Sequence, residues 1–177
     1  QGDYSKALEY FEEVLKIRLS VYGENHSRVA SVYNDIGEIY SVQGDDFKAL
    51  DYFKKSLKLD LSFFGENHPS VASGYYNIGY VYFAQKDYSK ALYYFEESLK
   101  IRLSLFGENH PEVALSYYSI GSLYIIQGDK SKALNYYEKS LKIRLSVYGE
   151  NHPLTKEIMD LINVANSKVL QSPETTK

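Results

Sequence analysis

A period of 42 residues runs through almost the whole of this 177-residue chain. The string Gly-Glu-Asn-His starts at four positions with this interval: Gly23, Gly65, Gly107 and Gly149. The tripeptide Lys-Ala-Leu keeps the interval, and so does a third series: Gly37, Gly79 and Gly121. Self-similarity at a fixed period is typical of repeat architectures, in which each unit buries its apolar face only by stacking on its neighbours. The period therefore predicts a stack of small units rather than one globular core.

Each period contains two helical patterns. Small and apolar residues in 70–85 recur at three- and four-residue steps, the spacing of one helix face: Val71, Tyr75, Ile78, Gly79 and Tyr82. The segment 89–103 shows the same spacing: Ala91, Leu92, Phe95, Leu99 and Leu103. The small residues allow the two backbones to approach closely, and the large ones fill the space around them. The sequence thus predicts an all-α fold of antiparallel helix pairs.

Glycine, aspartate and proline stand between the predicted helices. Gln-Gly-Asp separates the two helices of a pair at 43–45 and 127–129, where glycine can adopt the left-handed conformation that closes a helix and aspartate can cap the next one. At 85–87 Lys86 replaces this glycine, which we expect to lower stability slightly. Between pairs, proline follows His at Pro69 and Pro111, a favoured residue for the first turn of a helix.

These signals predict about eight helices in a single array over residues 1–170. An unpaired helix at 3–22 is followed by three pairs at 27–64, 69–106 and 111–148 and by a capping helix at 153–170. Residues 171–177 are expected to form a disordered tail. Because the chain opens within a repeat and without methionine, we expect it to be a piece of a longer array.

The order of the small and large residues matches a known repeat. Tyr75, Ile78-Gly79, Tyr82, Ala91 and Phe95 together resemble the tetratricopeptide repeat (TPR) signature. The Gly-x-x-His-Pro-x-Val-Ala connection at 65–72 and 107–114 resembles the 42-residue form found in kinesin light chains, and the resemblance covers roughly residues 2–160. It implies a right-handed superhelical solenoid that serves as a non-catalytic protein–protein interaction scaffold, with the first helix of each pair lining a concave groove.

The resemblance also indicates which side chains would contact a ligand. Candidate groove residues lie at fixed offsets from the repeated glycine, at positions where the repeats differ most: Asn34, Asp35, Glu38, Ser41 and Val42, then Tyr76, Asn77, Tyr80, Phe83 and Ala84, then Tyr118, Ser119, Ser122, Ile125 and Ile126. Exposed aromatic side chains would offer large contact area, and Asn77 could hydrogen-bond a ligand backbone. The alternative is that these aromatic residues pack against the neighbouring repeat.

The charges in this set restrict the ligand. None of the candidate groove positions holds Lys or Arg, which disfavours the carboxylate clamp that some TPR proteins use for a terminal carboxylate. Asp35 and Glu38 favour a ligand that is neutral or basic at that end. The basic residues with which kinesin light chains bind acidic peptides have no counterpart here, so we do not expect that kind of cargo binding.

The sequence offers no catalytic or metal-binding constellation. His26, His68, His110 and His152 follow the period, but equivalent loops should lie ~10 Å apart, whereas zinc ligands converge within about 2 Å of one ion. There is no cysteine, phosphate-binding loop or nucleophile elbow. The net charge of −3 and the lack of a long apolar run argue against nucleic acid and membrane partners. We expect no enzyme activity, no cofactor and a cytoplasmic location.

Three functional hypotheses remain open. The first is an interaction module that binds a peptide segment of a partner protein in its concave groove. The second is structural self-association by end-to-end stacking, because the helix at 3–22 carries no polar cap. The third is a regulatory repeat segment of a larger enzyme. The sequence does not identify the partner.

Overall fold

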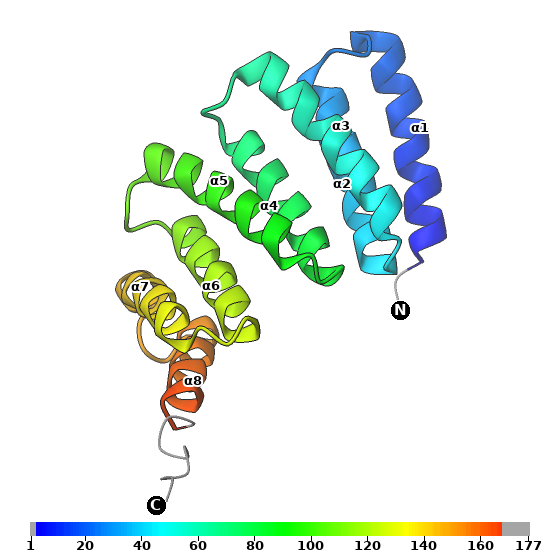
Figure 1. Cartoon of the computed structure of the whole chain (residues 1–177). Helices are drawn as coiled ribbons and strands as arrows, with labels where there is room; N and C mark the ends of the chain where they lie inside the picture. The colour runs from blue at the N-terminus through cyan, green and yellow to red at the C-terminus, as the bar shows by residue number, and fades with distance from the viewer. Residues whose placement is uncertain (1–2, 168–177) are drawn as a thin grey trace, which may run out of the picture. The chain divides into compact units, whose positions relative to one another are not determined.

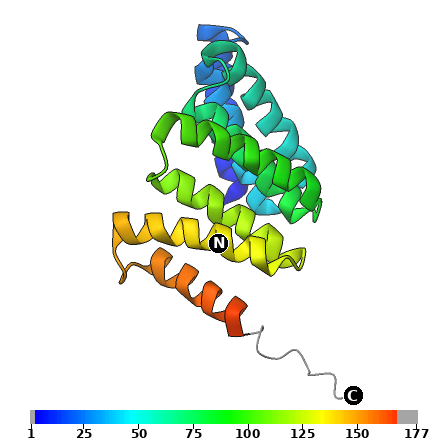
Figure 2. The same ribbon diagram turned by 60° about the vertical axis from the view of Figure 1, so that its left-hand side comes forward.

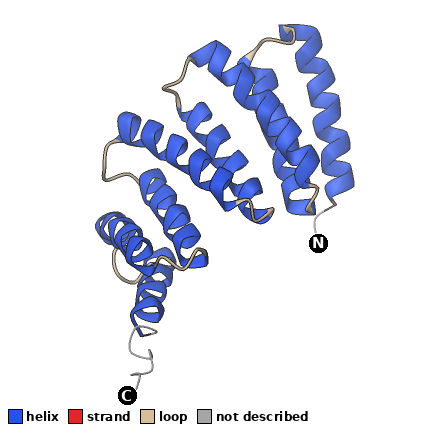
Figure 3. Cartoon of the chain, in the orientation of Figure 1, coloured by secondary structure: helices blue, strands red, loops and turns tan. Residues whose placement is uncertain are grey.

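The computed structural model describes residues 3–167, which form eight helices joined by short turns (Figure 1). Helices and loops account for all of this described part, as the colouring of Figure 3 shows. The predicted all-α fold is thereby confirmed. The predicted tail at 171–177 and the last three residues of the predicted capping helix, 168–170, lie outside the described residues.

The chain divides into two compact units near residue 105. The first contains α1 (Tyr4–Tyr22), α2 (Ser27–Gln43), α3 (Asp46–Phe64), α4 (Pro69–Ala84) and α5 (Tyr88–Phe106). The second contains α6 (Pro111–Ile126), α7 (Lys130–Tyr148) and α8 (Pro153–Ser167). Within each unit, consecutive helices run in opposite directions and pack side by side (Figures 1 and 2).

The turn inside each helix pair needs a residue in the left-handed region. Gly44 and Gly128 have φ of 79° and 83°, and Lys86 adopts the same conformation with φ of 62°. A side chain is strained there, which gives a physical reason for the expected loss of stability at Lys86. The aspartate that follows caps the next helix, as when the Asp45 carboxylate accepts from the Lys48 N–H at 3.2 Å.

The connection between pairs has its own cap. The Nδ1 atom of each repeated histidine accepts a hydrogen bond from the backbone N–H two residues later, as His68 does from Ser70 at 3.2 Å. The imidazole also stacks on the aromatic residue that ends the preceding helix, with the Phe64 and His68 ring centroids 3.8 Å apart. One histidine therefore closes one helix and starts the next, which accounts for its recurrence without any metal.

The repeated glycines mark the closest approach within a pair. A Cβ atom built on Gly79 would lie 2.8 Å from the ring of Phe95, and Gly37 and Gly121 face the aromatic rings of the following helix in the same way. Buried serines add a polar contact between neighbouring helices. Ser98 Oγ donates to the Ala72 carbonyl at 2.8 Å, a bond that spans 26 residues.

Candidate functional site

We call the first helix of each pair its A helix (α2, α4 and α6, with α8 in the same register) and the second its B helix (α3, α5 and α7, with α1 in the same register). The neighbouring A helices α2 and α4 bring predicted groove residues to one hollow in the first unit. Its volume is about 290 Å³, and α2 and α4 supply most of its lining: Glu38, Ser41, Val42, Tyr76, Asn77 and Tyr80, with Phe53 from α3. Val42 and Tyr80 are 67% and 53% exposed. This hollow therefore offers apolar contact area beside a carboxylate, from six of the residues that the repeat register selects.

A second hollow of about 460 Å³ lies at the other end of the same two helices. It is lined by Asn34 and Asp35 of α2, by Asp60 of α3 and by Ser70 of α4, among others. Asp60 is only 7% exposed, and burial raises its pKa to about 6. Within the described residues, no hydrogen bond or ion pair engages the Asp60 carboxylate.

A chain of amide hydrogen bonds connects α2 with α4 between these hollows. Asn77 Nδ2 donates to Asn34 Oδ1 at 2.9 Å, and Asn34 Nδ2 donates to Glu38 Oε1 at 2.8 Å. Burial and the neighbouring Glu38 carboxylate raise the pKa of Asp35, while Arg18 acts in the opposite direction. The predicted Asn77 thus already uses its NH₂ group to connect the two helices, and the surroundings of Asp35 and Glu38 are acidic.

The predicted aromatic residues of the first unit fall into two groups. Tyr80 is exposed, whereas Tyr76 is half-buried, with its ring centroid 5.2 Å from that of Phe95 and 4.8 Å from the Arg102 guanidinium. Phe83 is also half-buried and lies edge-on to Tyr88 at 6.0 Å, beside the turn that joins α4 to α5. Tyr80 is therefore open to solvent, whereas the described ring contacts of Tyr76 and Phe83 are with α5 of their own helix pair and not with the neighbouring repeat.

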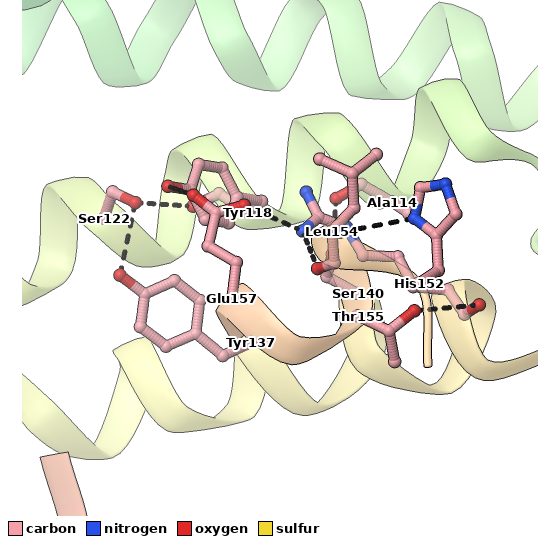
Figure 4. A network of polar contacts seen from close by, with 10 residues as sticks. Ala114, Tyr118, Ser122, Tyr137, Ser140, His152, Leu154, Thr155 and Glu157 are labelled. Atoms are coloured by element: carbon pink, nitrogen blue, oxygen red, sulfur yellow. Dashed lines mark hydrogen bonds and ion pairs between the residues drawn. The ribbon is translucent and has the colours of Figure 1, made fainter. Parts of the chain in front are cut away.

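In the second unit, the predicted residues take part in a polar network (Figure 4). The Tyr118 hydroxyl donates to Glu157 Oε1 on α8 at 2.9 Å, and burial and this carboxylate raise its pKa to about 12. Ser122 Oγ donates to the Tyr118 carbonyl at 3.0 Å and shares a hydrogen bond of 3.2 Å with the Tyr137 hydroxyl. Ser119 differs from the prediction because it is buried, its small side chain being easily covered. This surface is more internally bonded than that of the first unit.

The register of the A helices alone could not locate three further residues. Arg102 and Arg144 come from B helices, yet each guanidinium lies over a predicted groove tyrosine, Arg144 at 4.9 Å from the Tyr118 centroid. Asp60 occupies the equivalent position of α3. The sequence does contain a signal for these residues. One position that recurs with the 42-residue period holds arginine three times and aspartate once: Arg18, Asp60, Arg102 and Arg144.

A family model of the tetratricopeptide repeat matches the chain in three overlapping stretches, 1–62, 28–104 and 70–146. The chain belongs to the tetratricopeptide repeat family. TPR proteins are in general protein-interaction scaffolds without catalytic activity, and they bind protein partners. A search of curated proteins finds no significant match.

Solved structures of low sequence identity confirm the solenoid fold, and some of them bear the kinesin light chain name. BtubC (BKLC) from P. vanneervenii aligns with a TM-score of 0.79 at 20% identity, covering 99% of this chain and 78% of that protein. A Podosopora anserina protein with nearly identical TPR-like repeats of the kinesin light chain kind gives 0.72 at 16% identity, covering 97% and 90%. RapI in its apo form gives 0.81 at 16% identity, covering 95% of this chain and 58% of RapI.

Two negative findings concern the described residues 3–167. None of their helices combines the length and the apolar character that crossing a membrane requires. They also contain no group of three or more histidine or acidic side chains arranged to hold a metal ion. The candidate site of this TPR chain therefore consists of surface hollows between helices.

Proposed function

We propose that this chain binds a peptide segment of a partner protein along α2 and α4 of the first unit. The segment lies against the apolar surface of Val42 and Tyr80, with Glu38 beside it. The scaffold role follows from the repeat family, and the position of the ligand is our addition to it.

One observation carries the proposal. Residues that the repeat register selects independently on α2 and α4 line the same hollow, and two of its apolar side chains, Val42 and Tyr80, are open to solvent. Exposed aromatic and aliphatic side chains in a hollow provide the anchors on which peptide affinity usually depends. The charged side chain in the lining is that of Glu38, with Asp35 one turn before it on α2, so the favoured segment is neutral or basic.

A library of fluorescein-labelled peptides, screened by fluorescence anisotropy, tests the proposal. We expect a subset of neutral or basic peptides to bind, and Tyr80→Ala to weaken that binding at least tenfold, which corresponds to about 1.4 kcal/mol. Val42→Asp should weaken it as well, because it places a charge on the apolar wall.

Phe47→Ala provides the matched control. Phe47 is a more exposed aromatic residue of the same unit, but it lies outside the hollow, so its removal should leave the affinity unchanged. If Tyr80→Ala and Phe47→Ala weaken binding equally, or if no peptide binds, the proposed position of the ligand is wrong.

A second candidate function is self-association, and a specific feature of α1 favours it. Ile17 on α1 is 63% exposed, whereas Ile143, its equivalent on α7, is 3% exposed. None of the residues of α1 is buried. The open face of α1 could therefore pack against a second copy of the chain.

A further inference from the structure

The B helices carry an arginine at one fixed position, and this arginine has the same role wherever its contacts are described. Arg18 Nη1 donates to the Arg28 carbonyl at 2.5 Å, and Arg144 Nη1 donates to the Leu154 carbonyl at 2.6 Å. Both carbonyls lie at the start of the A helix that follows. Arg18 therefore joins α1 to α2, and Arg144 joins α7 to α8.

The repeat of α3 lacks this arginine. Asp60 occupies its position, and the equivalent carbonyl at the start of α4 belongs to Ser70. A carboxylate only accepts hydrogen bonds, so Asp60 cannot donate to Ser70 as the arginines do to their carbonyls. Asp60 and Ser70 instead line the hollow of about 460 Å³.

A second substitution enlarges the same hollow. Arg102 and Arg144 each lie over a tyrosine of the preceding A helix, Tyr76 and Tyr118. At the equivalent position, α2 has Asn34, which is smaller and lines the hollow too. The arginine and the tyrosine that meet in the other repeats are therefore both absent here, and two small polar side chains face the space.

The hollow is acidic, and its innermost group lacks a counterion. Asp60 is 7% exposed and, among the described residues, receives no hydrogen bond or ion pair. Asp35 adds a second carboxylate. The cation in the lining is Arg28, whose guanidinium donates to the Tyr22 hydroxyl and lies 4.9 Å from the centre of that ring. The Asp60 side chain is largely covered, its carboxylate opens to the hollow, and a carboxylate in such a position without a partner favours the entry of a cation.

We infer that this hollow binds the side chain of an arginine supplied by the partner segment, which takes the place of the arginine missing from this repeat. The inference rests on the proposed function, because it takes the arginine to come from the bound peptide. A guanidinium offers five donors in a flat fork, and the hollow supplies acceptors from Asp60 and Asp35. Lysine presents a compact point charge without this planar geometry, so arginine is preferred.

The test uses the full chain and a ligand small enough to report on this hollow alone. The blocked tripeptide acetyl-glycyl-arginyl-glycine amide is titrated into ¹⁵N-labelled protein, and amide shifts of Ser31, Ser70 and Ser73 are followed by NMR. The control ligand is its citrulline analogue, in which a neutral urea replaces the guanidinium. We expect a saturable shift with the arginine peptide and at least tenfold weaker binding of the citrulline peptide.

Three variants connect the shift with the site. Asp60→Asn removes the charge at constant shape and should weaken binding at least tenfold. Asp60→Arg restores the arginine of the other repeats, so it should fold normally, fill the hollow and abolish binding. Asp51→Asn is the matched control, because Asp51 lies on the same helix but is exposed and pairs with Lys55 at 2.7 Å. It should bind like the unchanged chain.

Equal shifts with the arginine and citrulline peptides would overturn the inference, and so would unchanged binding by Asp60→Asn. Either result would leave the proposed function untouched if the peptides of the library still depend on Tyr80. If the arginine tripeptide binds but no library peptide does, the result supports the arginine site and contradicts the proposed peptide-binding surface along α2 and α4.

Discussion

At the scale of single residues, Asp60 shows how one substitution in a periodic chain changes a structural contact into an open site. On α1 and α7 the same position holds an arginine that connects two helices, half-buried at Arg18 and buried at Arg144. With aspartate there, the helices keep their places, but the space between them opens and becomes acidic. A carboxylate buried without a partner should also lower the stability of the unliganded chain at neutral pH.

The loss of stability caused by Asp60 depends on pH, and the pKa of its carboxyl group determines whether stability rises or falls with pH. The folded-state pKa of about 6 lies above the ordinary value of 3.8, so the folded chain binds this proton more tightly than the unfolded chain does. The stability that protonation confers is fully present below about pH 4 and is lost as the pH rises through about 6. We expect Asp60→Asn to raise the free energy of unfolding by roughly 2 to 3 kcal/mol near pH 7.5 and to change it little near pH 4.

Urea denaturation followed by circular dichroism at several pH values measures this difference. Asp51→Asn serves again as the control, because its exposed side chain should leave the pH profile as it is. Parallel profiles for the unchanged chain and Asp60→Asn would show that Asp60 is not buried without a partner.

The position of Asp60 also shows why part of the candidate site escaped prediction. The groove residues were predicted from their offset to a repeated glycine, and this rule finds Tyr80 and Glu38 on A helices. A side chain from a B helix enters the site only because Asn34 and Ser70 leave room for it. Comparing equivalent positions reveals the odd charge, but only packing shows that the charge faces a hollow.

At the scale of helices, the repeated glycines and histidines determine how each element meets the next. The glycines allow two helices to approach closely, and the histidines cap the helix that follows them. The glycine positions could be predicted because each faces an aromatic ring in every full pair, a constraint that recurs with the period. The cap made by histidine could not, because nothing in the spacing shows that an imidazole accepts from a backbone N–H and stacks on an aromatic ring at once.

Two glycines of α4 provide a direct test of close helix packing. A Cβ atom at Gly79 would lie 2.8 Å from the Phe95 ring, whereas one at Gly74 would lie 3.1 Å from the flexible end of Leu57. We expect Gly79→Ala to destabilise the chain by about 1 to 3 kcal/mol through overpacking. Gly74→Ala should be nearly neutral, because a gain of about 1 kcal/mol in helix propensity offsets a small shift of Leu57.

Thermal unfolding of both variants beside the unchanged chain measures the difference. Equal melting temperatures for Gly79→Ala and Gly74→Ala would mean that the helices of this pair do not approach as closely as the structure has them.

The double role of the repeated histidine leads to a second prediction for the helices. His68→Ala removes a helix cap, worth about 0.5 to 2 kcal/mol, and a ring contact with Phe64 of about 0.5 to 1.5 kcal/mol. His68→Asn keeps a capping acceptor but loses the stacked ring, so its loss of stability should lie between zero and that of His68→Ala. Denaturant titrations of the two variants separate the contributions. A loss as large for Asn as for Ala would assign the whole effect to the ring.

At the scale of the whole molecule, the question is whether the chain acts alone or in contact with copies of itself. Among the places where apolar side chains are open to solvent, two bear on this question: the hollow of Val42 and Tyr80, and the face of α1 with Ile17. The first place fits a peptide and the second fits another copy of the chain. The two functions therefore predict different masses in solution.

Light scattering coupled to size exclusion, at several concentrations, distinguishes them. The peptide-binding function predicts a mass near 20.3 kDa at every concentration, both for the unchanged chain and for Tyr76→Ala/Tyr80→Ala. Growth with concentration that Ile17→Glu abolishes, and that the tyrosine variant leaves in place, would make self-association the leading function.

Hydrogen bonds described between helices join a helix to one that is near it in the sequence. The bond from Ser56, Ser98 or Ser140 to an alanine carbonyl spans 26 residues in each case, and the bond from Asn77 to Asn34 spans 43. Folding can therefore begin at any repeat and spread to its neighbour, without waiting for the two ends to meet. For the same reason, duplicating or deleting one whole period in the gene would leave the contacts within the remaining repeats in place. Such a chain can change its length during evolution while each surviving repeat is free to acquire a binding specificity of its own.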